Sequence, residues 1–218
     1  MKVVVVDARE RLGELLVSGA LTRGHEVTAF GAAFGASRHA PAAGPDGARG
    51  GPRIVSGDLL DRVAVAAAVA GQEAVLYAVE PPAGRGRTTR ASQGMLNIVR
   101  AMSAGRVRRL VCLSIGGSGS EPQGDQVGLV GRLFRSSPGR GALADLRQME
   151  VTVRQSGLDW TIVRPARLVD GAGKHLWRTA PGYALPRGTK IARADVAEFM
   201  LSQLESGIEV GHAVAIAW

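Results

Sequence analysis

The first 21 residues constrain the fold more than any other stretch of the chain. An apolar run, Val3–Val6, is followed by a short polar turn and then by a helical pattern in which Leu12, Leu15 and Leu16 fall on one side. A fully apolar strand that passes directly into a helix is typical of the first strand–turn–helix unit of a parallel sheet. We therefore expect an α/β fold that is built around this unit.

The same alternation of strand and helix continues along the chain. Further strands are expected at His25–Phe30, Arg53–Gly57, Ala74–Val79, Arg109–Ser114, Asp159–Arg164 and His212–Ala217. Helices are expected at Asp61–Ala70, from a cap at Thr88 or Thr89 to about Ala104, at Ala142–Gln155 and at Arg193–Glu205. This order predicts a single doubly wound parallel sheet, Rossmann-like, in one domain over residues 1–218, with ligands at its carboxyl edge. Segments at about 31–52 and 121–140 are expected to be flexible insertions, and Leu168–Gly188 is expected to form a loop.

Composition excludes several classes of protein. The net charge is +8, but the basic residues are spread along the chain, and aromatic residues make up 4%, too few for a base-stacking platform. The charge is therefore expected to reflect a solvated basic surface, with no specific nucleic-acid partner. No apolar run is long enough to cross a membrane, and no spacing of side chains matches a metal site. The single cysteine, Cys112, fits a reducing cytoplasm.

The turn after Val6 carries an unusual charge for its position. In dinucleotide-binding folds this turn holds three glycines, and the cofactor pyrophosphate lies on the N-terminus of the helix that follows. Here the three positions are Asp7, Glu10 and Gly13. A carboxylate ~4 Å from a phosphate charge costs about 4 kcal/mol at an effective dielectric of ~20. The turn therefore predicts weak or absent dinucleotide binding, unless the two acids only cap the helix, where they are favourable.

Four segments carry a resemblance to a known family. These are RVRRLVCLS (Arg106–Ser114), SGLDWTIVRP (Ser156–Pro165), LVDGAG (Leu168–Gly173) and RADVAEFML (Arg193–Leu201). They resemble the atypical short-chain dehydrogenases/reductases (SDRs), and more narrowly the small NAD(P)H-binding, NmrA-like and flavin-reductase-like members. The resemblance implies a Rossmann-like fold and an NAD(P)H-dependent reductase activity.

The chain departs from this family at functional positions. The family turn resembles Gly-Ala-Thr-Gly-x-x-Gly, which the stretch from Asp7 to Gly13 matches only at its last residue. A Tyr-x-x-x-Lys pair is absent, and the lysine that many members carry four residues before Glu150 is replaced by Leu146. The family's serine pair after the fifth strand survives only as Ser114. The chain therefore matches the family's scaffold motifs better than its cofactor-binding and catalytic motifs.

Candidate site residues fall in the loops that follow the strands. Asp7 and Glu10 are expected to act as the general acid or base. A substrate oxygen is expected to be oriented by Ser114, His175 or Tyr183. An apolar wall for the substrate is expected from Trp177, Ile115 and Pro165. If a dinucleotide binds, its expected contacts are Gly13 and Asp58. The structural alternative is that Ser114 bonds to the backbone, that the aromatic residues pack the loop down and that His175 is solvated.

Three functions remain open at this point. The favoured hypothesis is an enzyme that uses no cofactor and performs acid–base chemistry, such as isomerisation, cyclisation, dehydration or bond cleavage, on a hydrophobic small molecule. The second is a reductase that uses NADP or NAD with an atypical phosphate loop. The third is a non-catalytic NmrA-like ligand sensor. For all three we expect a small-molecule substrate or ligand and a cytoplasmic location, and each is compatible with a homo-oligomer.

Overall fold

The computed structural model describes residues 1–31, 51–80, 89–115, 140–182, 185 and 187–218. The strands are β1 (Lys2–Val6), β2 (Glu26–Gly31), β3 (Arg53–Ser56), β4 (Ala74–Tyr77), β5 (Arg109–Leu113), β6 (Asp159–Pro165), β7 (Arg167–Val169), β8 (Arg178–Pro181), β9 (Lys190–Ala192) and β10 (His212–Ala217). The helices are α1 (Arg11–Thr22), α2 (Arg62–Val69), α3 (Arg90–Gly105), α5 (Arg140–Arg154) and α6 (Arg193–Ser206).

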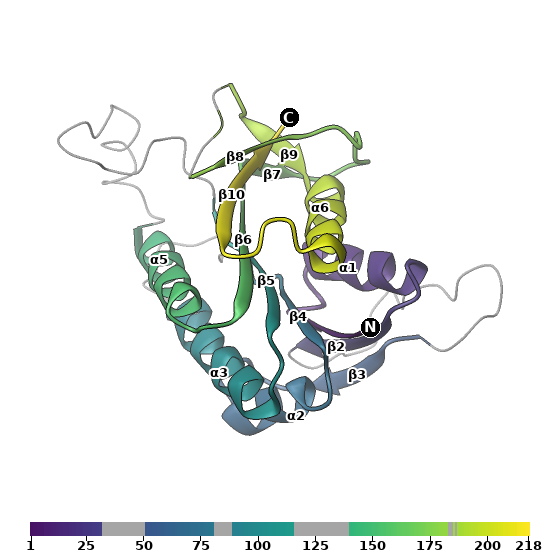
Figure 1. Ribbon diagram of the computed structural model, residues 1–218. Coiled ribbons are helices and arrows are strands. Elements are labelled where there is room, and N and C mark those ends of the chain that lie inside the picture. Colours follow the sequence, from purple (N-terminus) through teal and green to yellow (C-terminus); the bar gives the residue numbers. More distant parts are fainter. Residues whose placement is uncertain (32–50, 81–88, 116–139, 183–184, 186) are drawn as a thin grey trace.

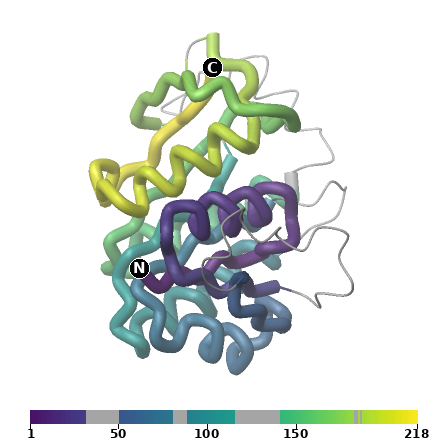
Figure 2. The backbone as a smooth tube through the Cα atoms, turned by 90° about the vertical axis from the view of Figure 1, so that its right-hand side faces the viewer, coloured from purple at the N-terminus to yellow at the C-terminus, as the bar shows by residue number. Residues whose placement is uncertain are grey.

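The described strands form one large sheet of mostly parallel strands. Its order is β3-β2-β1-β4-β5-β6-β10-β8, in which β8 alone pairs antiparallel, and β7 and β9 form a small separate pair. Figure 1 shows α2, α3 and α5 along one face of the sheet and α1 and α6 along the other. Figure 2 shows α6 lying beside α1 on that second face. The predicted α/β fold with a doubly wound, Rossmann-like sheet is confirmed.

Both faces of the sheet are buried, as the run of valines predicts. Val3 and Val5 pack into one core cluster with residues of α1 and α6. Val4 and Val6 pack into a second cluster with residues of α2, α3 and α5. Since successive side chains of a strand point to opposite faces, a strand covered on both sides needs an apolar residue at every position. The four valines are at most 1% exposed.

The structure differs from the sequence-based expectation in two places. Leu15 is 38% exposed, because α1 buries the stripe that contains Leu12, Leu16 and Val17 instead. The stretch from Leu168 to Gly188, expected as one long loop, contributes β7 and β8. The predicted flexible insertions lie almost entirely outside the described residues. Within those residues, no helix combines the length and the apolar character needed to span a bilayer.

Candidate functional site

The strand order reverses at β1, and this reversal locates the candidate site. β2 and β3 lie on one side of β1, while β4, β5 and β6 follow on the other. In open parallel sheets of this type, ligands bind beyond the carboxyl ends of the strands at such a reversal. Asp7 follows β1 directly, and Glu80 lies three residues beyond the end of β4. These two acids therefore flank the expected ligand position.

The turn after β1 has the backbone shape of a glycine turn without its first glycine. Asp7 has φ +62°, in the left-handed region that few residues other than glycine, asparagine and aspartate adopt readily. The amide of Glu10 donates to the carbonyl of Asp7 at 3.1 Å, and the amide of Ala8 donates to the carbonyl of Phe30 at 3.1 Å. Aspartate is thus one of the few side chains that this turn tolerates.

Gly13 is required by close packing between α1 and the turn. A Cβ at this position would lie 2.3 Å from the carbonyl oxygen of Asp7 and 2.7 Å from the Cα of Ala8. Both are backbone atoms and cannot move aside without displacing the turn. Gly13 therefore sets the distance between the first turn of α1 and the end of β1.

The N-terminus of α1 has no side-chain cap. Glu10 is its N-cap residue, with φ −73° and ψ 156°, but its carboxylate makes no capping hydrogen bond and the residue is exposed. The expectation that Glu10 caps the helix is therefore not met. The first amide groups of a helix have no partners within the helix and carry a partial positive charge. This end of α1 is suited to an anion.

Asp7 lies in a half-buried and mainly acidic environment. Burial raises the pKa of Asp7, the positive charge of Arg90 lowers it in part, and the nearby carboxylates of Glu10 and Glu80 raise it further. The net pKa lies above the ordinary value of 3.8. Asp7 therefore lies in an environment that disfavours its charged form.

This pKa shift gives a testable stability effect. Because the charged form of Asp7 is disfavoured in the folded protein, its ionisation costs stability above the folded pKa, and that cost disappears as the pH falls below it. Asp7→Asn, which keeps a residue tolerated at positive φ, is expected to raise the free energy of unfolding at pH 8 by about 0.5–2 kcal/mol. Urea denaturation should show this gain shrinking toward pH 4. An Asn variant that is less stable than the wild type at both pH values would contradict the assignment.

A chain of ion pairs crosses the carboxyl edge beside the turn. Arg193, the first residue of α6, donates to both oxygens of Glu80 at 2.8 and 2.7 Å and to Asp170 at 2.8 Å. The other oxygen of Asp170 accepts a hydrogen bond from Arg11. Separately, Asp58 accepts from the amide of Leu60 at 2.9 Å and from Arg90 at 3.0 Å. These ion pairs connect the segments that follow β4 and β7 to the first residues of α6 and α1, beside the candidate site.

Comparison with known proteins identifies the family. A family model described as NAD(P)H-binding matches residues 8–207 of the 218. The chain belongs to this NAD(P)H-binding family. No curated protein matches its sequence.

Solved structures share the fold of the chain at low sequence identity. A short-chain dehydrogenase/reductase from Veillonella parvula DSM 2008, in complex with NADP, is 20% identical with a TM-score of 0.77, over 100% of this chain and 94% of that one. A proposed NADH-flavin reductase from Streptococcus pneumoniae TIGR4 is 20% identical with a TM-score of 0.78, over 100% and 99%. An anaerobillin reductase from Escherichia coli O157:H7 is 19% identical with a TM-score of 0.74, over 100% and 97%.

The expectation that the protein uses no cofactor is wrong. The matched family is NAD(P)H-binding, and a similar structure is in complex with NADP. From the sequence alone, Asp7 and Glu10 are two full charges that face a phosphate. In the structure, Asp7 keeps the turn's shape through its positive φ, and Glu10 is exposed.

Ser114 of this NAD(P)H-binding chain belongs to a buried polar group. Its amide donates to the carbonyl of Val163 at 2.8 Å, and its hydroxyl donates to the carboxylate of Glu150. Glu150 is 2% exposed and forms a two-point ion pair with Arg164, which is 1% exposed, with one nitrogen–oxygen distance of 2.8 Å. Burial raises the pKa of Glu150, but hydrogen bonds from Arg164 and Ser114 outweigh it, so the net pKa is lowered. Ser114 is therefore engaged with Glu150.

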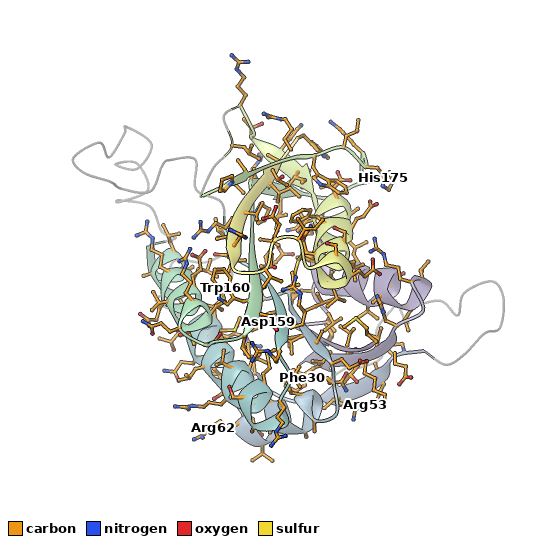
Figure 3. All side chains as sticks on the ribbon, in the orientation of Figure 1. Phe30, Arg53, Arg62, Asp159, Trp160 and His175 are labelled. Atoms are coloured by element: carbon orange, nitrogen blue, oxygen red, sulfur yellow. The ribbon has the colours of Figure 1, made fainter. Side chains whose placement is uncertain are left out.

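His175 lies on the outer side of α6, as Figure 3 shows. Its ring Nδ1 is 2.6 Å from Glu198, and its side chain is 76% exposed. Its amide and that of Lys174 donate to the two oxygens of buried Asp195, which also accepts from the indole of Trp218 at 2.7 Å. His175, Asp195 and Glu198 offer ligand atoms within 4.8 Å of one another. Hydrogen bonds already account for the oxygens of Asp195, so we interpret the group as a clamp on the loop.

Asp195 is a structural residue that the sequence interpretation did not single out. The available signal was an acid in the first turn of the helix within RADVAEFML, a position where acids are favourable. Within the described residues, Ser114 donates to Glu150 and His175 contacts Glu198, whereas Asp7 lies near the charges of Arg90, Glu10 and Glu80. The structure therefore does not assemble the three into one hydrogen-bonded group.

The remaining candidates have mainly packing contacts. Trp177 meets Phe199 of α6 edge-on, with ring centroids 6.2 Å apart, and packs against a core cluster. Ile115 packs against the other cluster, and Pro165 is buried at the end of β6. Tyr183 lies outside the described residues. These contacts match the structural alternative for Trp177.

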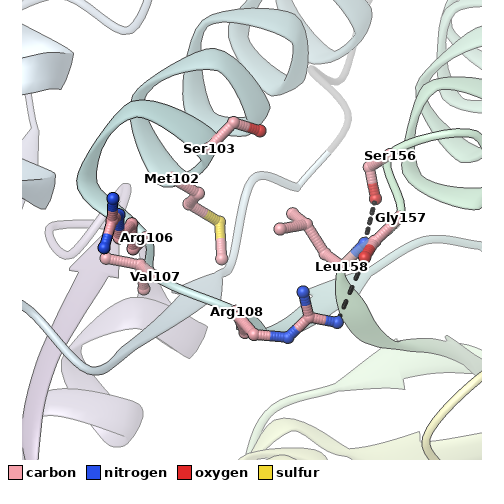
Figure 4. A pocket seen from close by; sticks show the side chains of 8 residues that line it. All are labelled: Met102, Ser103, Arg106, Val107, Arg108, Ser156, Gly157 and Leu158. Carbon is pink, nitrogen blue, oxygen red and sulfur yellow. Dashed lines mark hydrogen bonds between the residues drawn. The ribbon is translucent and has the colours of Figure 1, made fainter.

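A hollow of about 420 Å³ lies at the opposite edge of the sheet (Figure 4). Its lining comes from the segments that lead into β5 and β6: Met102, Ser103, Arg106, Val107, Arg108, Ser156, Gly157 and Leu158. Arg108 forms a two-point ion pair with Asp159 and donates to the carbonyl of Gly157 at 3.3 Å. Ligands of parallel sheets bind at the carboxyl edge, so this hollow is separate from the candidate site.

Proposed function

We propose that the protein is an NAD(P)H-dependent reductase of small molecules. The observation that carries the proposal is the family match, which runs from Ala8 in the turn after β1 to Gly207 at the end of α6. Bound NAD(P)H supplies a hydride for transfer to an acceptor. The reductase hypothesis, which was the second choice from the sequence, is the one that the family favours.

The residues around the turn fit a dinucleotide phosphate. The uncapped N-terminus of α1 presents amide groups to an anion, and Gly13 keeps that end of the helix close to the turn. Arg11, the first residue of α1, places a guanidinium at the same end. In our proposal these groups bind the phosphates, and Asp58, which was expected as a cofactor contact, remains a candidate on the neighbouring loop.

The proposed acceptor is a flat, conjugated small molecule. Two proteins with the same fold are named as reductases of such compounds, a flavin and anaerobillin. Tyr183 remains a candidate proton donor, and Ile115 and Pro165 remain candidate substrate contacts. His175 is a weaker candidate, because it is exposed and already contacts Glu198. Ser114 is a weaker candidate, because its hydroxyl already donates to Glu150.

Oxidation of reduced nicotinamide tests the proposal. Purified protein is mixed with NADPH or NADH and with FMN, FAD or a linear tetrapyrrole, and the absorbance of the reduced nicotinamide is followed. We expect acceptor-dependent oxidation at about 1 s⁻¹ or faster with at least one pair. A matched reaction with Gly51→Ala, where a Cβ would meet no atom of the described part of the chain within 4 Å, should behave as the wild type.

A ligand sensor is the second candidate, and one observation favours it. The Tyr-x-x-x-Lys pair is absent, and Tyr77 is fully buried with its hydroxyl donating to the carbonyl of Ala91 at 2.9 Å. Saturable binding of NADPH without oxidation by any acceptor would favour the sensor over the reductase.

A further inference from the structure

The ion pairs beside the turn differ in how firmly they hold. Arg193 and Glu80 are only 17% and 19% exposed, and two nitrogens of Arg193 contact two oxygens of Glu80. Arg11 and Asp170 are 69% and 57% exposed and share a single contact. Paired charges in open solvent contribute little to stability, whereas a two-point arginine–carboxylate pair is strong. The Arg11–Asp170 pair is thus the weak link of the chain.

Arg11 also lies at the end of α1 where the phosphate is expected, two residues after Arg9 of the turn. It is the first residue of α1, and the turn before it carries the acids Asp7 and Glu10. A phosphate at this helix end needs a positive side chain to offset those carboxylates. Guanidinium binds phosphate oxygens with two parallel hydrogen bonds, which suits Arg11 to this role.

Asp170 can release Arg11 without becoming an unpaired charge. Its second oxygen accepts a hydrogen bond from Arg193 at 2.8 Å, and Arg193 is held in place by Glu80. After release, Asp170 would keep one cationic partner. The exchange therefore leaves no isolated carboxylate at the edge of the site.

We propose that Arg11 is a ligand of the cofactor phosphate and that Asp170 holds it in the cofactor-free protein. Binding exchanges the Arg11–Asp170 pair for an Arg11–phosphate pair. This inference rests on the proposed function, because it requires that NAD(P)H binds at α1. Asp170 then acts as an internal competitor of the phosphate and lowers the affinity for the cofactor.

Titration of NADPH against four single variants tests the exchange. Arg11→Gln should weaken binding about tenfold or more through loss of a charge-assisted contact. Asp170→Asn should tighten it by about threefold or more, because the competitor is removed. The matched controls are Arg23→Gln and Glu205→Gln, which break the exposed pair at the other end of α1. Both should stay within about twofold of the wild type.

The double variant separates the exchange from a general effect of charge. In an Arg11→Gln background, Asp170→Asn should no longer tighten binding, because no arginine remains to be released. If it tightens binding equally in both backgrounds, or if it weakens binding in the wild type, the exchange is refuted while NADPH binding itself stands. If the wild type binds neither NADPH nor NADH, the proposed function fails and the exchange fails with it. Unfolding midpoints of all variants provide the check on folding.

Discussion

Replacement of Glu150 by glutamine is expected to lower the free energy of unfolding by about 3–5 kcal/mol. Arg164 is 1% exposed, and Glu150 is 2% exposed and meets it with both carboxylate oxygens. Glutamine is nearly the same size but carries no charge, so the buried guanidinium would lose the charge of Glu150. Loss of one partner of a buried pair is costly because the other charge stays out of water.

Urea denaturation at pH 7 measures this effect, and an exposed pair supplies the control. Asp159→Asn, which breaks the pair with Arg108 where both side chains are well exposed, should cost less than about 1 kcal/mol. The pKa of Glu150 is lowered from its ordinary value of 4.5, so its stabilisation is present above that value and is lost as the pH falls through the lower folded pKa. Equal losses for the two variants at pH 7 would contradict the role assigned to the buried pair.

Replacement of Gly13 by alanine is expected to damage both the fold and cofactor binding. The added Cβ would lie 2.3 Å from the carbonyl oxygen of Asp7 and within 3 Å of two backbone atoms of Ala8. The start of α1 must move away from the turn, at a cost of about 1–3 kcal/mol for an overpacked site. The same movement takes the amide groups of α1 away from the phosphate position.

The measurements for Gly13→Ala are the urea midpoint and the affinity for NADPH. We expect a lower midpoint and an affinity reduced by about tenfold or more, which corresponds to about 1.4 kcal/mol. Gly51→Ala, where a Cβ meets no atom of the described residues within 4 Å, serves as the control and should change stability by no more than about 0.5 kcal/mol. A Gly13→Ala variant that keeps both properties would show that the close contact is not required.

The sequence was sufficient to predict the scaffold because its signals are local. Runs such as Val3–Val6 are apolar at every position, which only a strand buried on both faces requires. Asp61 precedes α2 and accepts from the amides of Val63 and Ala64, as an acid at a helix start suggests. Boundaries of the main strands and helices therefore agree closely with the structure.

The missed features all depend on partners that are distant along the chain. The residues of β8 show no alternation of buried and exposed positions, and the strand is stabilised by antiparallel pairing with β10. At the start of α3, the amides of Ala91 and Ser92 donate to the carboxylate of Asp145 in α5. The sequence pattern instead predicted a cap by Thr88 or Thr89 at this position. Tertiary contacts of this kind leave no mark in the spacing of residues.

The error over the cofactor had the same origin. The residue types at Asp7 and Glu10 were read correctly, but their effect depends on backbone angle, burial and neighbours. Asp7 holds the left-handed conformation that a glycine would otherwise supply, and burial with neighbouring carboxylates raises its pKa. The sequence alone does not show that Asp7 keeps the shape of a glycine turn or that Glu10 is exposed.

Calorimetric titration of the wild-type protein with NADPH and NADH tests most directly whether the turn after β1 binds a nicotinamide cofactor. We predict saturable binding at one site per chain by at least one of them, with a dissociation constant of about 1 mM or lower, equivalent to about −4 kcal/mol or better. Asp7→Gly should tighten that binding, because it removes a carboxyl from the turn. Heat signals that never saturate with either cofactor, in the wild type and in Asp7→Gly alike, would contradict the account.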